Sequence, residues 1–184
     1  MVEMEKRYVS PTSEASEIHF LVRHLERIKP GTSFPAIADL VAEKARRIAL
    51  KGESDPTLYV NVTGKGDPIL ELIREKWKAR QPIAVYFNHG DRRERESLKV
   101  TLGKAFLVTR LQALLQSNRI HLPAMQEART LADDLLDYEV RLVENANQRE
   151  GAFRVGKRDE LVTALGMAVQ DDVGGHRSGN MRLR

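Results

Sequence analysis

In the first third of the chain, hydrophobic and polar residues alternate with the two-residue period of a strand. After residue 31 the hydrophobic residues recur with the longer period of a helix. Apolar residues alternate with polar ones over residues 17–28, which predicts a half-buried strand. Residues 29–31 end that strand, and the apolar residues after them recur at helical spacing. Thr32 or Ser33 is placed to cap this helix, and we expect Gly52 to end it.

The next part of the chain predicts a buried strand, a glycine turn and a second helix. Residues 58–62 form an apolar run, residues 63–68 form the turn, and the apolar residues of 69–77 have helical spacing. Another strand is predicted over residues 83–87. Strands that alternate with helices in this way are joined by crossovers. We therefore predict an α/β fold in which residues 58–62 and 83–87 are parallel neighbours in one mixed sheet.

The second half of the chain predicts two helices, a hairpin and a last helix. The first of these helices ends near Ser117, and the second begins at Ala124. Residues 138–143 and 152–155 alternate and are expected to pair as a hairpin. Residues 159–169 are small and apolar enough to form a last helix that packs tightly on the sheet.

Length and composition limit the class of protein. The 184 residues, 41% of them hydrophobic, suit one domain. We expect that domain to span residues 1–172, to begin with the end of a strand in residues 1–8, and to be followed by a disordered tail of residues 173–184. No apolar stretch approaches the ~20 residues that cross a bilayer, so no membrane partner is expected. The absence of cysteine and of an apolar leader favours an intracellular location.

Charge permits a nucleic-acid partner without requiring one. The net charge is +4, from 30 Lys+Arg and 26 Asp+Glu. Residues 88–96 are highly charged, have no apolar pattern and predict a mobile surface loop. In and after this segment Arg92, Arg93, Arg95 and Lys99 are interleaved with acidic residues. The segment is therefore either a solvated loop that compensates its own charge or a contact for DNA.

Asn61 stands at the end of a predicted buried strand, where ligands and metals collect in α/β sheets. Its amide oxygen has two interpretations. It caps the following turn by accepting from a backbone N–H, or it replaces a metal-binding carboxylate and keeps an oxygen without the charge. Gly64 and Gly66 likewise serve a tight turn, because glycine accepts positive φ, or they approach a phosphate closely.

Asp159 and Glu160 begin the last predicted helix. Acidic side chains in a first helical turn are stabilised by the positive end of the helix, and the same carboxylates are hard oxygen ligands for a divalent ion. His89 is either an exposed loop residue or a contact for a metal or phosphate. Three other histidines share no metal-ligand spacing: His19, His24 and His121.

The order of these motifs resembles the C-terminal nuclease domain of phage terminase large subunits, the motor proteins that package viral DNA. The resemblance covers nearly the whole chain and implies an RNase H-like (RuvC-like) fold, a mixed sheet flanked by helices, with its first strand incomplete here. The segments that carry it occur in the order 22–27 with 31–35, 62–68 (Val-Thr-Gly-Lys-Gly-Asp-Pro), 107–116 and 158–162.

The resemblance implies metal-dependent cleavage of double-stranded DNA. In this family three clustered acids hold two Mg²⁺ or Mn²⁺ ions, which activate water and stabilise the leaving oxygen. Asp159 matches the acid of the closing helix, with Glu160 beside it as a second ligand. Asn61 stands where the family has an acid before the Thr-Gly turn, and the first acid would precede Met1. The chain is thus expected to be N-terminally truncated, and impaired in catalysis as an isolated chain.

The implied partners are double-stranded DNA, the terminase ATPase portion, the small terminase subunit and the portal, in the cytoplasm of a bacterial host cell. Lys65, Lys99 and Lys104 are expected to steer backbone phosphates. No Gly-x-x-x-x-Gly-Lys-Ser/Thr loop occurs here, so the chain cannot drive translocation alone. Two alternatives stay open, namely a non-catalytic module that binds DNA or docks on the motor, and a nonfunctional prophage remnant.

Overall fold

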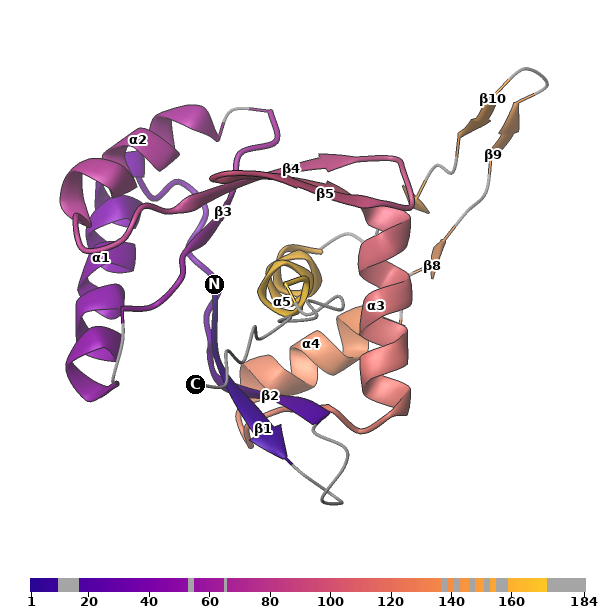
Figure 1. Ribbon diagram of the computed structural model, residues 1–184, viewed down its shortest axis with the longest axis horizontal. Helices are drawn as coiled ribbons and strands as arrows, with labels where there is room; N and C mark the ends of the chain where they lie inside the picture. The colour runs from indigo at the N-terminus through magenta and orange to yellow at the C-terminus, as the bar shows by residue number, and fades with distance from the viewer. Residues whose placement is uncertain are drawn as a thin grey trace, which may run out of the picture.

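A computed structural model describes residues 1–9, 17–52, 55–64, 66–136 and 159–171, together with the backbone of four short strands between residues 139 and 154 (Figure 1). The strands are β1 (Val2–Val9), β2 (Glu17–Leu25), β3 (Tyr59–Asn61), β4 (Ile83–Asn88), β5 (Arg93–Glu96), β6 (Lys99–Gly103), β7 (Ile120–His121), β8 (Glu139–Val140), β9 (Val143–Asn145), β10 (Gln148–Glu150) and β11 (Phe153–Arg154). The helices are α1 (Phe34–Lys51), α2 (Asp67–Lys76), α3 (Lys104–Gln116), α4 (Gln126–Leu136) and α5 (Glu160–Val169).

Two mixed sheets form the α/β fold. The first has the order β3-β4-β6-β5, with β3, β4 and β6 parallel and β5 antiparallel to β6. The predicted parallel pairing of β3 with β4 is confirmed, with Asn61 opposite Val85. The second sheet has the order β1-β2-β7, in which β2 pairs antiparallel with β1 and parallel with β7. The expected sheet is thus divided, because in the described part of the chain β1 and β3 do not pair.

Local sequence signals set the ends of the helices. Ser33 caps α1, because its Oγ accepts a hydrogen bond from the Ala36 N–H at 3.4 Å. Thr32 instead donates its hydroxyl to the carbonyl oxygen of Lys29 at 2.7 Å. At the other end of α1 Gly52 closes the helix as predicted. Just past the end of α3, Asn118 adopts a left-handed conformation with φ 54°, which asparagine tolerates better than most residues.

The last helix is the centre of the main hydrophobic core. Figure 1 shows α5 between the two sheets, with α3 and α4 beside it. Leu161 and Leu165 are fully buried. A Cβ atom on Gly166 would lie 2.3 Å from Cγ of Leu107, so only glycine lets α5 approach α3 this closely. The closest packing of this helix is thus against α3, whereas the prediction placed it against the sheet.

The prediction of a mobile loop over residues 88–96 is wrong for residues 93–96 and for Asn88, which ends β4. Residues 93–96 form β5, an edge strand paired antiparallel with β6. Alternation explains the strand, because Arg93 and Arg95 point to one face, where both reach Asp171 just past the end of α5. Glu94 and Glu96 are exposed. Charged residues are common on edge strands, where they hinder pairing with other chains.

The predicted hairpin is confirmed in its backbone. β8 and β11 pair antiparallel, with Val140 opposite Phe153, and β9 and β10 pair beyond them. The first eight residues form more than the end of a strand, because β1 pairs with β2 along its whole length. Residues 173–184, expected to be a disordered tail, lie outside the described residues.

Candidate functional site

The turn after β3 is built by Asn61 and two glycines. Oδ1 of Asn61 accepts a hydrogen bond from the Thr63 N–H at 3.0 Å, so this side chain caps the turn. Gly64 has φ +78°, a conformation that glycine adopts without strain. A Cβ on Gly66 would lie 2.2 Å from Cα of Val62, which makes glycine obligatory there as well. The turn interpretation of all three residues therefore holds. Lys65, between the glycines, lies outside the described residues.

A small pocket brings Asn61 and Asp159 together. It has a volume of about 100 Å³, and its lining residues come from the turn after β3, from β4 and from the starts of α3 and α5: Asn61, Thr63, Phe87, Lys104, Leu107, Asp159 and Thr163. Thr63 ties the turn to β4, because its Oγ1 accepts from the Phe87 N–H at 2.8 Å. Asn61, Lys104 and Asp159 are thus the three predicted site residues that share a pocket.

Asp159 and Glu160 have different surroundings although they are neighbours. Asp159 precedes the first turn of α5, where its carbonyl oxygen accepts from the Thr163 N–H at 2.8 Å. Its side chain does not cap the helix and is left to the pocket. Glu160 does not line the pocket. Its carboxylate is exposed and lies 3.9 Å from the guanidinium of Arg27, which also pairs with Asp134.

The two predicted phosphate-steering lysines that the structure describes, Lys99 and Lys104, are not gathered in one place. Lys104 begins α3 and lines the small pocket. Lys99 lies on the other face of the sheet, since its ammonium sits 4.9 Å from the ring centroid of Tyr86, which packs on the side of α2. Its neighbour Val100 points the opposite way, into the main core.

A two-metal centre does not fit these residues. Among the residues that the structure describes, no group of three or more His, Cys, Asp or Glu could hold a metal ion. The pocket offers one carboxylate, from Asp159, and the oxygen of Asn61 already accepts the Thr63 N–H. Hard divalent cations require several oxygen ligands, and a pair of them requires shared anionic ligands.

A second polar cluster, which was not predicted above, surrounds Asp171. The hydroxyl of Tyr59 donates to this carboxylate, Arg93 binds it at 2.6 Å and Arg95 binds it at 3.0 Å. Burial alone would raise the pKa of Asp171, but the Tyr59 hydrogen bond and the charges of Arg95, Lys6 and Arg93 outweigh it and lower the pKa. Burial and the same carboxylate raise the pKa of Tyr59. The cluster fastens the end of α5 to β3 and β5.

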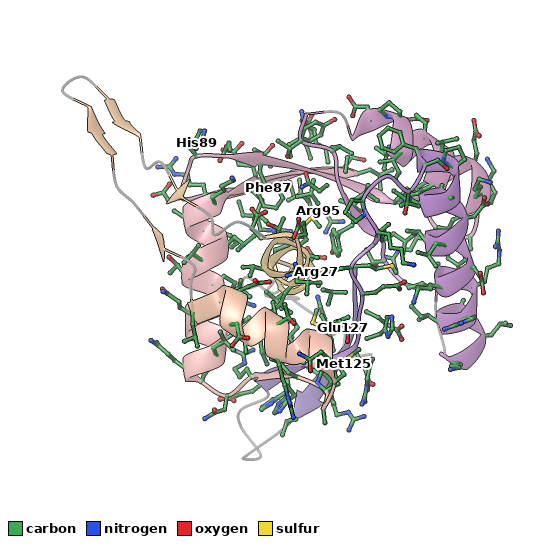
Figure 2. The ribbon with its side chains drawn as sticks, turned by 180° about the vertical axis from the view of Figure 1, so that it is seen from behind. Arg27, Phe87, His89, Arg95, Met125 and Glu127 are labelled. Atoms are coloured by element: carbon green, nitrogen blue, oxygen red, sulfur yellow. The ribbon has the colours of Figure 1, made fainter. Side chains whose placement is uncertain are left out.

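Arginines thus hold α5 at both ends. Arg27 contacts its first turn through Glu160, and Arg95 contacts the residue just past its last turn through Asp171. Figure 2 shows both arginines beside this helix. The signal that could have revealed Arg93 and Arg95 is their two-residue spacing, which places both side chains on one face of a strand.

None of the histidines in the described residues lines the small pocket. His89 is exposed just past the end of β4, as Figure 2 shows. Nδ1 of His19 lies 2.8 Å from Nε2 of His121, with the rings stacked at a centroid distance of 5.1 Å. This contact follows from the parallel pairing of β2 with β7, which joins segments far apart in the sequence.

A much larger cavity, of about 710 Å³, lies beside the small pocket and shares Asn61 with it. Its walls are formed by β1 and β3 together with α1, α2 and α5. Most of its lining residues are apolar.

Comparison of the chain with protein-family models, with curated proteins and with solved structures gives no match. Within the described residues no helix is long and apolar enough to cross a bilayer.

Proposed function

We propose that this chain is a nuclease domain of the phage terminase large-subunit type, with an RNase H-like fold, that contacts double-stranded DNA but cuts it weakly or not at all as an isolated chain. The observation that supports this most is the small pocket, in which Asn61 and Asp159 meet beside Lys104. These are the middle and closing positions that the resemblance implies, and the cation beside them suits a backbone phosphate.

The same pocket is the reason to expect impaired cleavage. Asp159 is its one carboxylate, and the two-metal centre that the resemblance implies, with Mg²⁺ or Mn²⁺, does not fit the residues present. Chemistry that relies on such a centre loses most of its rate when anionic ligands are missing. The proposed role of Lys104 is to bind a phosphate, and that of Asn61 is to hold the turn that shapes the pocket.

A second candidate is a non-catalytic module that binds DNA or docks on the packaging motor. The bond from the Thr63 N–H to Asn61 favours it, since it gives this side chain a structural role that needs no metal. In either case the proposed partners are those of the motor, namely its ATPase portion, the small subunit and the portal, in the bacterial cytoplasm.

DNA binding at low salt tests the shared part of both candidates. We expect the Lys104→Ala variant to weaken binding of a fluorescent duplex several-fold and to reduce the slope of log K against log salt by about 1. Lys99→Ala is the matched control, because Lys99 lies on the other face of the sheet. Equal effects of the two substitutions, or no binding by the folded chain, would contradict the proposal.

Plasmid cleavage with Mn²⁺ separates the two candidates. A nuclease domain should gain nicking activity when Asn61→Asp restores a carboxylate, and Asp159→Ala should abolish that gain. If DNA binds but neither the original chain nor Asn61→Asp cuts it, the non-catalytic module is the better description.

A further inference from the structure

The large cavity faces the edges of two strands. Residues 1–4 line it from the start of β1, and residues 56–61 line it from β3 and the segment before it. Consecutive side chains of a strand point to opposite faces of the sheet. A cavity that contacts every residue in turn therefore lies along the edge of each strand, and Arg23 and His24 of β2 also reach it.

Both edges have no strand partner in the part of the chain that the structure describes. β1 pairs with β2 on its other side, and β3 pairs with β4. An open edge presents a row of backbone N–H and C=O groups that can bind another strand ~4.7–4.9 Å away. Two such edges thus border one cavity.

Helices cover the cavity on both faces. From one side it is lined by α1 and α2, with Lys44 and the apolar residues Ile37, Val41, Ala45, Ile48, Ile69 and Ile73. From the other side it is lined by α5, with Ala164, Met167 and Ala168. Figure 1 shows β1 and β3 between these two groups of helices. This is the environment of a central strand in an α/β sheet, which is buried on both faces and reads as a continuous apolar run.

We propose that this cavity is a docking groove for an extended apolar strand of a partner polypeptide, which pairs with β1 and β3 and joins the two sheets into one. Backbone hydrogen bonds to both edges supply binding that is independent of side chains, and the helices on each face select apolar side chains. The inference does not depend on the proposed function, since it rests on the strand edges and the helices alone.

Residues 10–16 and 172–184, which the structure does not describe, lack the required chemistry. Residues 10–16 read Ser-Pro-Thr-Ser-Glu-Ala-Ser and contain no large apolar residue. Residues 172–184 follow Asp171 at the cavity wall, but they hold three glycines and three arginines and no run of apolar residues. Strands are depleted in glycine and proline. Neither segment supplies the apolar strand that the groove fits, and the occupant we propose is a strand of a partner polypeptide.

A tethered strand provides the test. A run of about six valine, isoleucine and threonine residues, the usual length of a strand, is fused after Arg184 through a glycine-serine linker. The tether raises its effective concentration to about millimolar. Amide hydrogen exchange is then measured over residues 1–4 and 58–61. The control fusion carries proline at alternate positions, which removes the donors that pair with an edge.

The proposal expects the strand to slow exchange at least about tenfold in both β1 and β3, which corresponds to the protection of a paired edge. The proline version should leave both unchanged. Equal protection by the proline version, or protection of only one of the strands, would overturn the proposal.

Two further outcomes would assign the groove to a different occupant. In the unfused protein, faster exchange of both edges after deletion of residues 172–184 would identify the tail of the chain as the occupant. Slower exchange with rising protein concentration would identify a second copy. Each of these results would overturn the proposal that the occupant is a partner polypeptide.

A matched pair of substitutions checks the location. Ala168→Trp fills the groove from α5 and should abolish the protection that the fused strand gives, whereas Ala113→Trp, on the exposed side of α3, should not. Circular dichroism of both variants confirms that each is folded. Protection that survives Ala168→Trp would place the strand elsewhere and would contradict the proposal.

Discussion

The two sides of α5 differ in how closely they are packed. Toward α3 and α4 the helix is fully buried, and at Gly166 it approaches Leu107 more closely than alanine would allow. Toward β1 and β3 the same helix lines an open cavity of about 710 Å³ with Ala164, Met167 and Ala168. One side of α5 is thus tightly packed, and the other side borders a cavity. The sequence pattern alone does not tell which side of α5 is tightly packed, since both sides are apolar.

The largest loss of stability is expected when a side chain on the tightly packed side of α5 is truncated. Leu165 is fully buried, so Leu165→Ala should lower the free energy of unfolding by about 3 kcal/mol, within a usual range of ~2–5. Met167→Ala should cost less, about 1–2 kcal/mol, because Met167 already borders a cavity. Urea denaturation of both variants measures this difference. Equal losses would show that the two sides of α5 are packed alike.

Substitutions that add volume should also cost more on the side toward α3 than on the side toward the cavity. Gly166→Ala places a methyl group against the buried Leu107 side chain, so we expect a loss of about 1–3 kcal/mol despite the better helix propensity of alanine. Ala168→Leu extends into the cavity and should change stability by no more than about 0.5 kcal/mol. Thermal unfolding compares the two variants. A stabilised Gly166→Ala protein would contradict the close contact of α5 with α3.

The contribution of the polar cluster around Asp171 to stability should decrease in acid. Asp171→Asn should cost about 1–2 kcal/mol at neutral pH, because Arg93 and Arg95 lose their anionic partner. The folded-state pKa of Asp171 lies below its unfolded value, so this contribution is present above about pH 4 and is lost as pH falls through the folded pKa. The gap between the two proteins should therefore close in acid.

Urea denaturation between pH 7 and pH 2 measures this gap. Asp91→Asn is the control, because Asp91 is exposed and lies 3.9 Å from Arg92, and it should change stability little at any pH. A difference between Asp171→Asn and the original chain that stays constant with pH would mean that the carboxylate charge does not hold the end of α5.

The smallest expected effect concerns the turn that borders the cavity. Asn61→Ala removes the acceptor for the Thr63 N–H and should cost about 0.5–1 kcal/mol, since the site is exposed. Asn61→Asp keeps an oxygen at that place and should cost less than about 0.5 kcal/mol. Chemical denaturation distinguishes the two. If both substitutions cost the same, the oxygen of Asn61 does not support the turn.

Elements that depend on local periodicity were predictable from the sequence. The five helices in the described residues follow from apolar spacing within each segment, and the parallel pairing of β3 with β4 follows from the alternation of strands with helices. β5 was not predictable in this way, because its two arginines bind Asp171, which lies more than seventy residues later in the chain. The division of the sheet was also hidden, since an edge strand and a central strand can have the same sequence pattern.

The candidate site was predictable in part for the same reason. The resemblance paired Asn61 with Asp159, and the structure brings both to one pocket with Lys104. It could not tell that Glu160 faces Arg27, because that depends on where the end of β2 lies relative to α5. The position of Lys99 could have been read from its neighbour, since Val100 is a core residue and adjacent strand residues point to opposite faces.

The place of α5 in the chain has a consequence for synthesis. This helix fills the space between sheets whose strands were all made earlier, and β2 finds its parallel partner β7 only about a hundred residues later. On the ribosome, the apolar faces that α5 covers stay exposed until residues 160–169 have emerged. Non-local contacts of this kind fold slowly, and nascent chains with uncovered apolar surface are those that chaperones bind. We therefore expect chains that stop before residue 159 to aggregate.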